Sequence, residues 1–85
     1  MGLVTRVVPD AELISEATKF ATQLATGPTA AYGGVKRLVI DSFTNTLEAQ
    51  MYLEGDYISA MGRTADGREG IASFLAKRPP KFSGK

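Results

Sequence analysis

Proline, glycine and helix-capping residues divide this 85-residue sequence into short segments, and this division limits the folds open to the chain. Pro9 closes an apolar run, Gly27 and Pro28 separate two helical patterns, Thr46 can cap a third helix, and Gly62 can end it. Proline has no N–H to donate inside a helix or strand, and glycine adopts the turn conformation at helix ends at little cost. We therefore predict an all-α chain, in which four helices follow a short extended N-terminal segment.

The spacing of apolar residues supports helices between these breaks, because residues four and seven positions apart share one face of a helix. Residues 3–8 are mostly β-branched and apolar before Pro9, which indicates a short strand or an extended edge segment. We therefore divide the chain into an extended lead at 1–9 and a helical region at 10–85. The first three helical segments each carry an apolar stripe on one face: Leu13, Ala17, Phe20, Ala21 and Leu24; Ala31, Val35, Leu38, Val39 and Phe43; Leu47, Met51, Ile58 and Met61.

The last helical segment has two overlapping start signals. Thr64 can be the N-cap, or Asp66 and Glu69 can form a capping box in which each side chain binds an otherwise unpaired backbone N–H. Pro79 disfavours the helical conformation of Arg78, so we predict that the helix ends there. Its narrow stripe would consist of Ile71, Phe74, Leu75 and Arg78.

A basic group follows this helix and consists of Lys77, Arg78 and Lys81. Residues 64–85 carry five basic and two acidic side chains, whereas residues 1–63 carry five basic and seven acidic ones. The basic group can be a solvated terminus, or it can be a local anion site, since phosphate binds clustered cations well.

The composition excludes several kinds of chemistry. The sequence has no Cys and no His, which removes disulfides, thiol nucleophiles, imidazole catalysis and the usual zinc ligands. A net charge of +1 argues against a nucleic-acid-binding protein, and no apolar run is long enough to span a membrane. We expect a soluble, cytoplasmic chain with no metal site and no catalytic residue of its own.

Two sequence blocks resemble those of the enoyl-CoA hydratase/isomerase (crotonase) family, in its carboxyl-terminal region. The second block lies at the family's distance from the first, so the resemblance covers nearly the whole chain. Residues 45–50, 53–54 and 74–80 look most like the phenylacetate-pathway isomerases. The first block is Gly2, Leu3, Val4, Val7, Val8 and Pro9, and the second is Asp66, Glu69, Gly70, Phe74, Lys77, Arg78, Pro80 and Phe82.

The resemblance implies a C-terminal fragment of an enzyme that acts on an acyl-CoA thioester, with coenzyme A as part of the substrate and no separate cofactor. The catalytic groups of the family lie in an N-terminal domain that would precede Met1, so the fragment alone would be inactive. It would serve in homo-oligomerisation, which is trimeric in the family, and in capping the substrate pocket. For the fragment itself we expect a dimer or a higher oligomer.

Two site residues follow from the resemblance. Phe74 would line the acyl end of the pocket, and Lys77 would reach the nucleotide phosphates. A third family position, often aromatic, is Ile58 here, and this departure puts that contact in doubt. The alternative is a free-standing helical binding or dimerisation module that has lost the catalytic half. The reading frame upstream of Met1 would distinguish the two.

Overall fold

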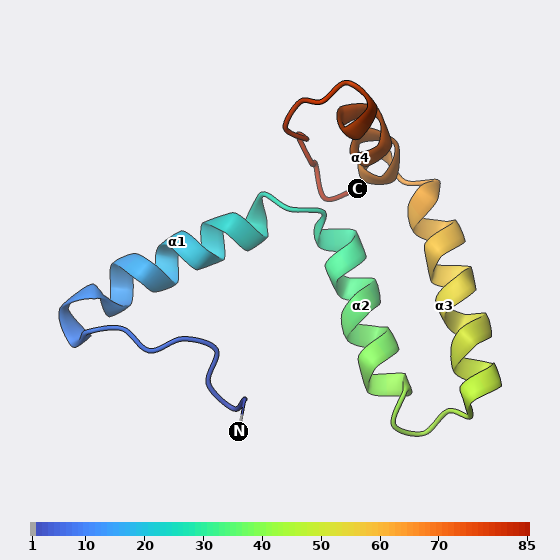
Figure 1. Ribbon diagram of the computed structural model, residues 1–85, viewed down its shortest axis with the longest axis horizontal. Coiled ribbons are helices and arrows are strands. Elements are labelled where there is room, and N and C mark those ends of the chain that lie inside the picture. Colours follow the sequence, from blue (N-terminus) through green and yellow to red (C-terminus); the bar gives the residue numbers. More distant parts are fainter. Residues whose placement is uncertain (1) are drawn as a thin grey trace.

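The computed structural model describes residues 2–85, so Met1 lies outside the described residues. Four α-helices and one 3₁₀ turn follow an extended lead, which confirms the predicted all-α class (Figure 1). Residues 3–8 form no strand in the described chain. The elements are the 3₁₀ turn η1 (Asp10–Glu12), α1 (Leu13–Ala25), α2 (Thr29–Asp41), α3 (Leu47–Gly62) and α4 (Ala65–Leu75).

The helices form a thin, open layer. Figure 1 shows α2 and α3 side by side as a hairpin, with α4 across one end and α1 leading away on the other side of α2. The principal extents are 46 × 38 × 19 Å, and the radius of gyration is 16.2 Å. A compact chain of this length would have a radius of gyration of about 12 Å. The described chain therefore does not close around a core of its own.

The hairpin of α2 and α3 is held by a close backbone approach and by one amide. Gly34 is buried, and a Cβ atom at this position would lie 3.0 Å from the Tyr57 ring. Gln50 on α3 donates from Nε2 to the Leu38 carbonyl oxygen at 3.0 Å. Thr46 begins α3 as predicted, and its hydroxyl accepts a hydrogen bond from the Ala49 N–H at 3.2 Å.

The apolar stripes of the helices are exposed in the described chain. No hydrophobic residue among those described is buried, and large apolar side chains on every helix are exposed. Val35 on α2 is 58% exposed, Met51 on α3 63%, and Ile71 on α4 62%. The reason is geometric, because a single layer of helices has no second layer against which to place these stripes.

A side-chain cap begins α4, and backbone hydrogen bonds end it. Thr64 is the N-cap, and its hydroxyl accepts from the Gly67 N–H at 2.9 Å, so the alternative capping box is wrong. The helix ends at Leu75 and not at Arg78, because the chain turns before Pro79 can act. The Lys77 N–H donates to the Phe74 carbonyl at 3.2 Å, and the Arg78 N–H donates to the Ser73 carbonyl at 3.0 Å. This is a Schellman closure, which binds the last carbonyls of a helix.

None of the helices among residues 2–85 combines the length and the apolarity needed to cross a bilayer.

Candidate functional site

The candidate site lies where the C-terminal tail, residues 76–85, folds back along α4. Asp66 on the first turn of α4 is 5% exposed and anchors the far end of this tail. Its carboxylate accepts from the Ser83 N–H at 2.6 Å, from the Ser83 hydroxyl at 3.2 Å and from the Gly84 N–H at 2.7 Å. The Asp66 N–H in turn donates to the Lys85 carbonyl at 2.9 Å. The buried charge is therefore fully hydrogen-bonded, as burial requires.

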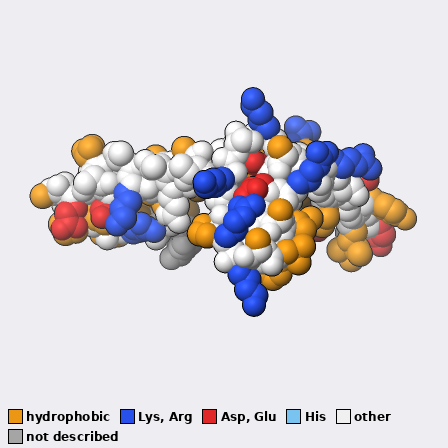
Figure 2. All heavy atoms as spheres, turned by 90° about the horizontal axis from the view of Figure 1, so that it is seen from above, with side chains coloured by type: hydrophobic (Ala, Val, Ile, Leu, Met, Phe, Trp, Pro, Cys, Tyr) orange, Lys and Arg blue, Asp and Glu red, His pale blue; other side chains and the backbone are white. Residues whose placement is uncertain are grey.

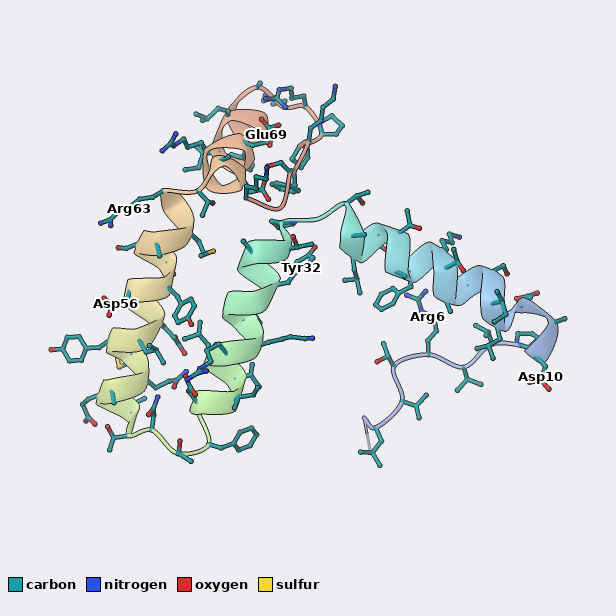
Figure 3. All side chains as sticks on the ribbon, turned by 180° about the vertical axis from the view of Figure 1, so that it is seen from behind. Arg6, Asp10, Tyr32, Asp56, Arg63 and Glu69 are labelled. Carbon is teal, nitrogen blue, oxygen red and sulfur yellow. The ribbon has the colours of Figure 1, made fainter. Side chains whose placement is uncertain are left out.

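Glu69, one turn further along α4, binds the near part of the tail. Its carboxylate accepts from both terminal nitrogens of Arg78, at 2.5 and 3.2 Å, and from the Lys81 N–H at 3.0 Å. Figure 3 shows Glu69 between α4 and the returning tail. The Arg78 guanidinium and the Lys81 amide lower the pKa of Glu69 to about 2, and the same pairing raises the pKa of Arg78.

The two predicted site residues lie next to each other at the C-terminal end of α4. Phe74 is 82% exposed, although it belongs to the stripe of α4. Lys77 has φ +53°, the left-handed conformation, and its backbone N–H binds the Phe74 carbonyl. The Lys77 side chain is exposed, and within residues 2–85 no hydrogen bond or ion pair to its ammonium group is present.

Ile58 is not part of this arrangement. It lies on α3 and is 74% exposed. It lines a shallow groove between α2 and α3 whose walls include Val35 and Tyr57 but neither Phe74 nor Lys77. The structure therefore brings Phe74 and Lys77 together and leaves the third position apart.

The basic group predicted from the sequence is divided by the structure. Arg78 is paired with Glu69, whereas the side chains of Lys77 and Lys81 are exposed. Figure 2 looks onto the end of the molecule formed by α4 and the tail, where Lys and Arg side chains surround an acidic centre. Such a rim of exposed cations suits an anionic ligand, and the paired arginine supports the backbone between them.

The sequence analysis missed the role of Asp66 and Glu69 as anchors of the tail. Both residues were interpreted as helix-capping groups, because a carboxylate in the first turn of a helix usually acts locally. Their partners lie 9 to 18 residues further along the chain. The only available signal was that two carboxylates precede a basic segment. No cluster of metal-binding side chains is present in the described part of the chain.

Comparisons with known proteins place the whole chain in one family. The sequence model described as Enoyl-CoA hydratase/isomerase matches residues 1–85. A 1,2-epoxyphenylacetyl-CoA isomerase of Escherichia coli K12 is 46% identical over 84 residues, which cover 99% of this chain and 32% of that protein. A probable enoyl-CoA hydratase of Rhodobacter capsulatus is 41% identical over 85 residues, which cover 100% of this chain and 33% of that protein.

Solved structures agree with the sequence matches. An enoyl-CoA hydratase of Geobacillus kaustophilus superimposes with a TM-score of 0.87 at 32% identity, over 99% of this chain and 32% of that one. An enoyl-CoA hydratase of Polaromonas gives a TM-score of 0.88 at 35% identity, over 96% of this chain and 32% of that one. The chain thus spans about a third of the length of these relatives. With a family match over its full length, this chain belongs to the enoyl-CoA hydratase/isomerase family.

Proposed function

We propose that this chain is the C-terminal helical part of an acyl-CoA hydratase or isomerase, in which it caps the substrate pocket and takes part in subunit contacts. The observation that carries the proposal is the absence of a buried apolar core among the described residues. Despite this, the arrangement of helices matches parts of proteins three times as long, with TM-scores of 0.87 and 0.88. Helices placed in this way require a further layer, and the remainder of an enoyl-CoA hydratase would supply it. The lead at 1–9 and the helical region at 10–85 are then its two parts.

The proposed substrate is an acyl-CoA thioester, and its coenzyme A moiety enters as part of the substrate and not as a separate cofactor. Phe74 would line the acyl end of the pocket, where an exposed aromatic ring gains from burial against an apolar acyl group. Lys77 would contact the nucleotide phosphates with its unpaired ammonium group. The 46% identity to a 1,2-epoxyphenylacetyl-CoA isomerase favours an isomerase of aromatic-acid degradation over a hydratase. A cytoplasmic location remains a prediction.

The chemical step would use groups outside this chain. A thioester carbonyl is activated by backbone N–H groups that form an oxyanion hole, and a positioned carboxylate then moves the proton. This chain has no His and no Cys, and the carboxylates of Asp66 and Glu69 are hydrogen-bonded to the tail. We therefore expect the 85-residue chain to be inactive by itself towards crotonyl-CoA. Turnover above the buffer rate, abolished by one substitution in this chain, would contradict the proposal.

Association with a second surface is part of the proposal. Exposed apolar side chains on the lead, α1 and α2 include Leu3, Val7, Ile14, Val35 and Ile40. A soluble monomer rarely exposes a large contiguous apolar patch. The isolated chain should therefore sediment as a dimer or a higher oligomer at micromolar concentration. A well-folded monomer at that concentration would contradict this expectation.

A chimera tests the substrate-capping role directly. In it, this chain replaces the matching third of the Escherichia coli 1,2-epoxyphenylacetyl-CoA isomerase, to which it is 46% identical. In the active chimera, Lys77→Ala should raise KM for the CoA thioester about tenfold, the value of one charge-assisted contact, with little change in kcat.

Lys19→Ala on α1 is the matched control, because it removes an exposed lysine far from α4 in the sequence. KM should be unchanged in this variant. A chimera that is active and assembled, but whose KM does not respond to Lys77→Ala, would refute the role assigned to Lys77.

A further inference from the structure

The backbone of Lys77 is unusual for a residue with a side chain. Its φ of +53° is the left-handed conformation, which glycine adopts freely and in which a Cβ atom crowds the following carbonyl. Helices that close with a Schellman motif usually carry glycine at this position. Lysine here forgoes that local stability. Such an outlier points to a function for the side chain that it places.

The carboxylate of Glu69 binds the residues that follow Lys77. Glu69 binds the Arg78 guanidinium through two nitrogens and the Lys81 N–H at 3.0 Å. On the other side, the N–H groups of Lys77 and Arg78 bind the last turn of α4. Lys77 is thus enclosed between the helix end and a loop fixed to that same helix. This support holds the left-handed backbone, so the Cα–Cβ bond of Lys77 leaves the end of α4 in one direction.

We propose that Glu69 is a positioning residue: by binding Arg78 and the Lys81 amide, it holds Lys77 in the orientation that lets its ammonium group select a terminal phosphate monoester of a nucleotide. The inference rests on the proposed function, in which Lys77 contacts the phosphates of coenzyme A. It goes beyond that function in assigning the selectivity to a residue that does not touch the ligand. A loose lysine would attract any polyphosphate, whereas a directed one distinguishes ligands by where their charge lies.

The test compares two ligands that differ by one phosphate. The chain is titrated with CoA and with dephospho-CoA, and binding is followed by the amide shifts of residues 74–82. The wild-type chain should prefer CoA by about tenfold, the value of one charge-assisted hydrogen bond. Glu69→Gln keeps the size of the side chain but removes its charge. The preference for CoA should then fall towards one, while dephospho-CoA binds as well as before or better, because the positive charge of Arg78 is released.

Two further variants separate positioning from charge. The double variant Glu69→Gln/Arg78→Gln has the same net charge as the wild type, but its loop is still unheld, so the preference for CoA should remain lost. Lys77→Gly keeps the left-handed backbone and the pair of Glu69 with Arg78, and it should lose the preference without disturbing the tail. Asp56→Asn is the matched control, since Asp56 is exposed on the outer side of α3 (Figure 3).

Each outcome decides between the possibilities. If Glu69→Gln weakens both ligands by the same factor, or retains the preference, Glu69 does not position Lys77. If the double variant regains the preference, charge masking by Arg78 explains the effect, and the inference fails. If the wild-type chain shows no preference and no shifts clustered at residues 74–82, the proposed function of Lys77 fails instead. Helical Cα chemical shifts retained over residues 65–75 verify that α4 is intact in each variant. Arg78→Gln breaks the same pair from the other side and should also lose the preference for CoA.

Discussion

The two ends of the chain are ordered by different means. At the C-terminal end, two carboxylates on α4 bind the tail through six hydrogen bonds, half of them from backbone N–H groups. At the N-terminal end, the lead folds back along α1, and Arg6 lies over the ring of Phe20 at 5.1 Å from its centroid (Figure 3). Apart from the hydrogen bond of the turn at Pro9, no backbone hydrogen bond joins the lead to the helix that follows it in the described chain.

This difference shows that the tail is ordered by contacts within the chain, whereas the lead and α1 present apolar surface to a second partner. The tail finds its polar partners on α4, so its shape is determined within these 85 residues. The lead and α1 present mainly apolar side chains, among them Leu3, Val7 and Ile14, and these have no partner in the described chain. Hydrogen bonds are directional and can order a segment without a core, whereas apolar contact needs a second face. The position of α1 therefore depends on what packs against it.

The largest effect is expected from removing the buried carboxylate of α4. Asp66→Ala deletes three hydrogen bonds and leaves the N–H groups of Ser83 and Gly84 without their acceptor. Hydrogen bonds to a charged group contribute about 1.5–3 kcal/mol each and are not additive, so the free energy of unfolding should fall by about 2–3 kcal/mol. Urea unfolding measures the loss, and limited proteolysis should cut the released tail. Asp56→Ala on α3 is the control and should change the free energy of unfolding little. Equal losses in the two variants would show that Asp66 contributes no more to stability than the exposed Asp56.

A smaller effect is expected at the start of α4. Thr64→Ala removes the side-chain cap of the Gly67 N–H and should lower stability by about 1 kcal/mol. Thermal unfolding followed by circular dichroism measures this loss. Thr22→Ala on α1 removes a hydroxyl that binds only the carbonyl one turn back, and it should change the free energy of unfolding by less than about 0.5 kcal/mol. A larger loss at Thr22 than at Thr64 would mean that α1 is as well determined within the chain as α4.

The contact between the lead and α1 should be weaker still. Arg6→Ala removes an exposed cation–π contact, which is worth about 0.5–1 kcal/mol at most. The chemical shifts of Phe20 and of residues 3–8 should change, while global unfolding remains nearly unaltered. Arg63→Ala, at the junction of α3 and α4, is the control for loss of an exposed arginine. Loss of helical signal throughout α1 in Arg6→Ala would show that this contact organises the N-terminal end.

The weakest effect is expected from acid, because the pair of Glu69 with Arg78 is exposed to solvent and exposed ion pairs contribute little. The pKa of Glu69 is about 2 in the folded chain and about 4.3 in an unfolded one, so folding favours the ionised form. The stabilisation is complete above about pH 4.5 and is lost as the pH falls towards 2. The protection of the Lys81 amide, the ratio of its intrinsic to its observed hydrogen-exchange rate, should decrease over this range, and Glu69→Gln should abolish the change in protection. Protection at Lys81 that is independent of pH in the wild-type chain would contradict the hydrogen bond.

Local signals in the sequence were sufficient for the helices and for their starts. Thr46 and Thr64 begin α3 and α4 because a hydroxyl that accepts from an N–H three residues on is a contact within one turn. Phe74 and Lys77 are predicted as site residues from a contiguous motif that resembles the family's, and their role stays a prediction. The early end of α4 was not predictable in this way. Its cause is a left-handed lysine, and nothing in the local preferences of lysine indicates that conformation.

The sequence by itself therefore determined the helical segments and their capping residues, because these depend on residues close together in the chain, and it determined the family through two motif blocks and the spacing between them. Only the tertiary structure decided that Asp66 and Glu69 bind the tail, that Arg78 is paired while the Lys77 side chain has no partner among residues 2–85, and that the apolar stripes are exposed. The first two depend on contacts between residues 9 to 18 positions apart, whose geometry the spacing of residue types does not encode. The exposure of the stripes depends on whether a second layer packs on the helices. Apolar periodicity identifies the face of each helix that can be buried, but it does not identify what buries that face.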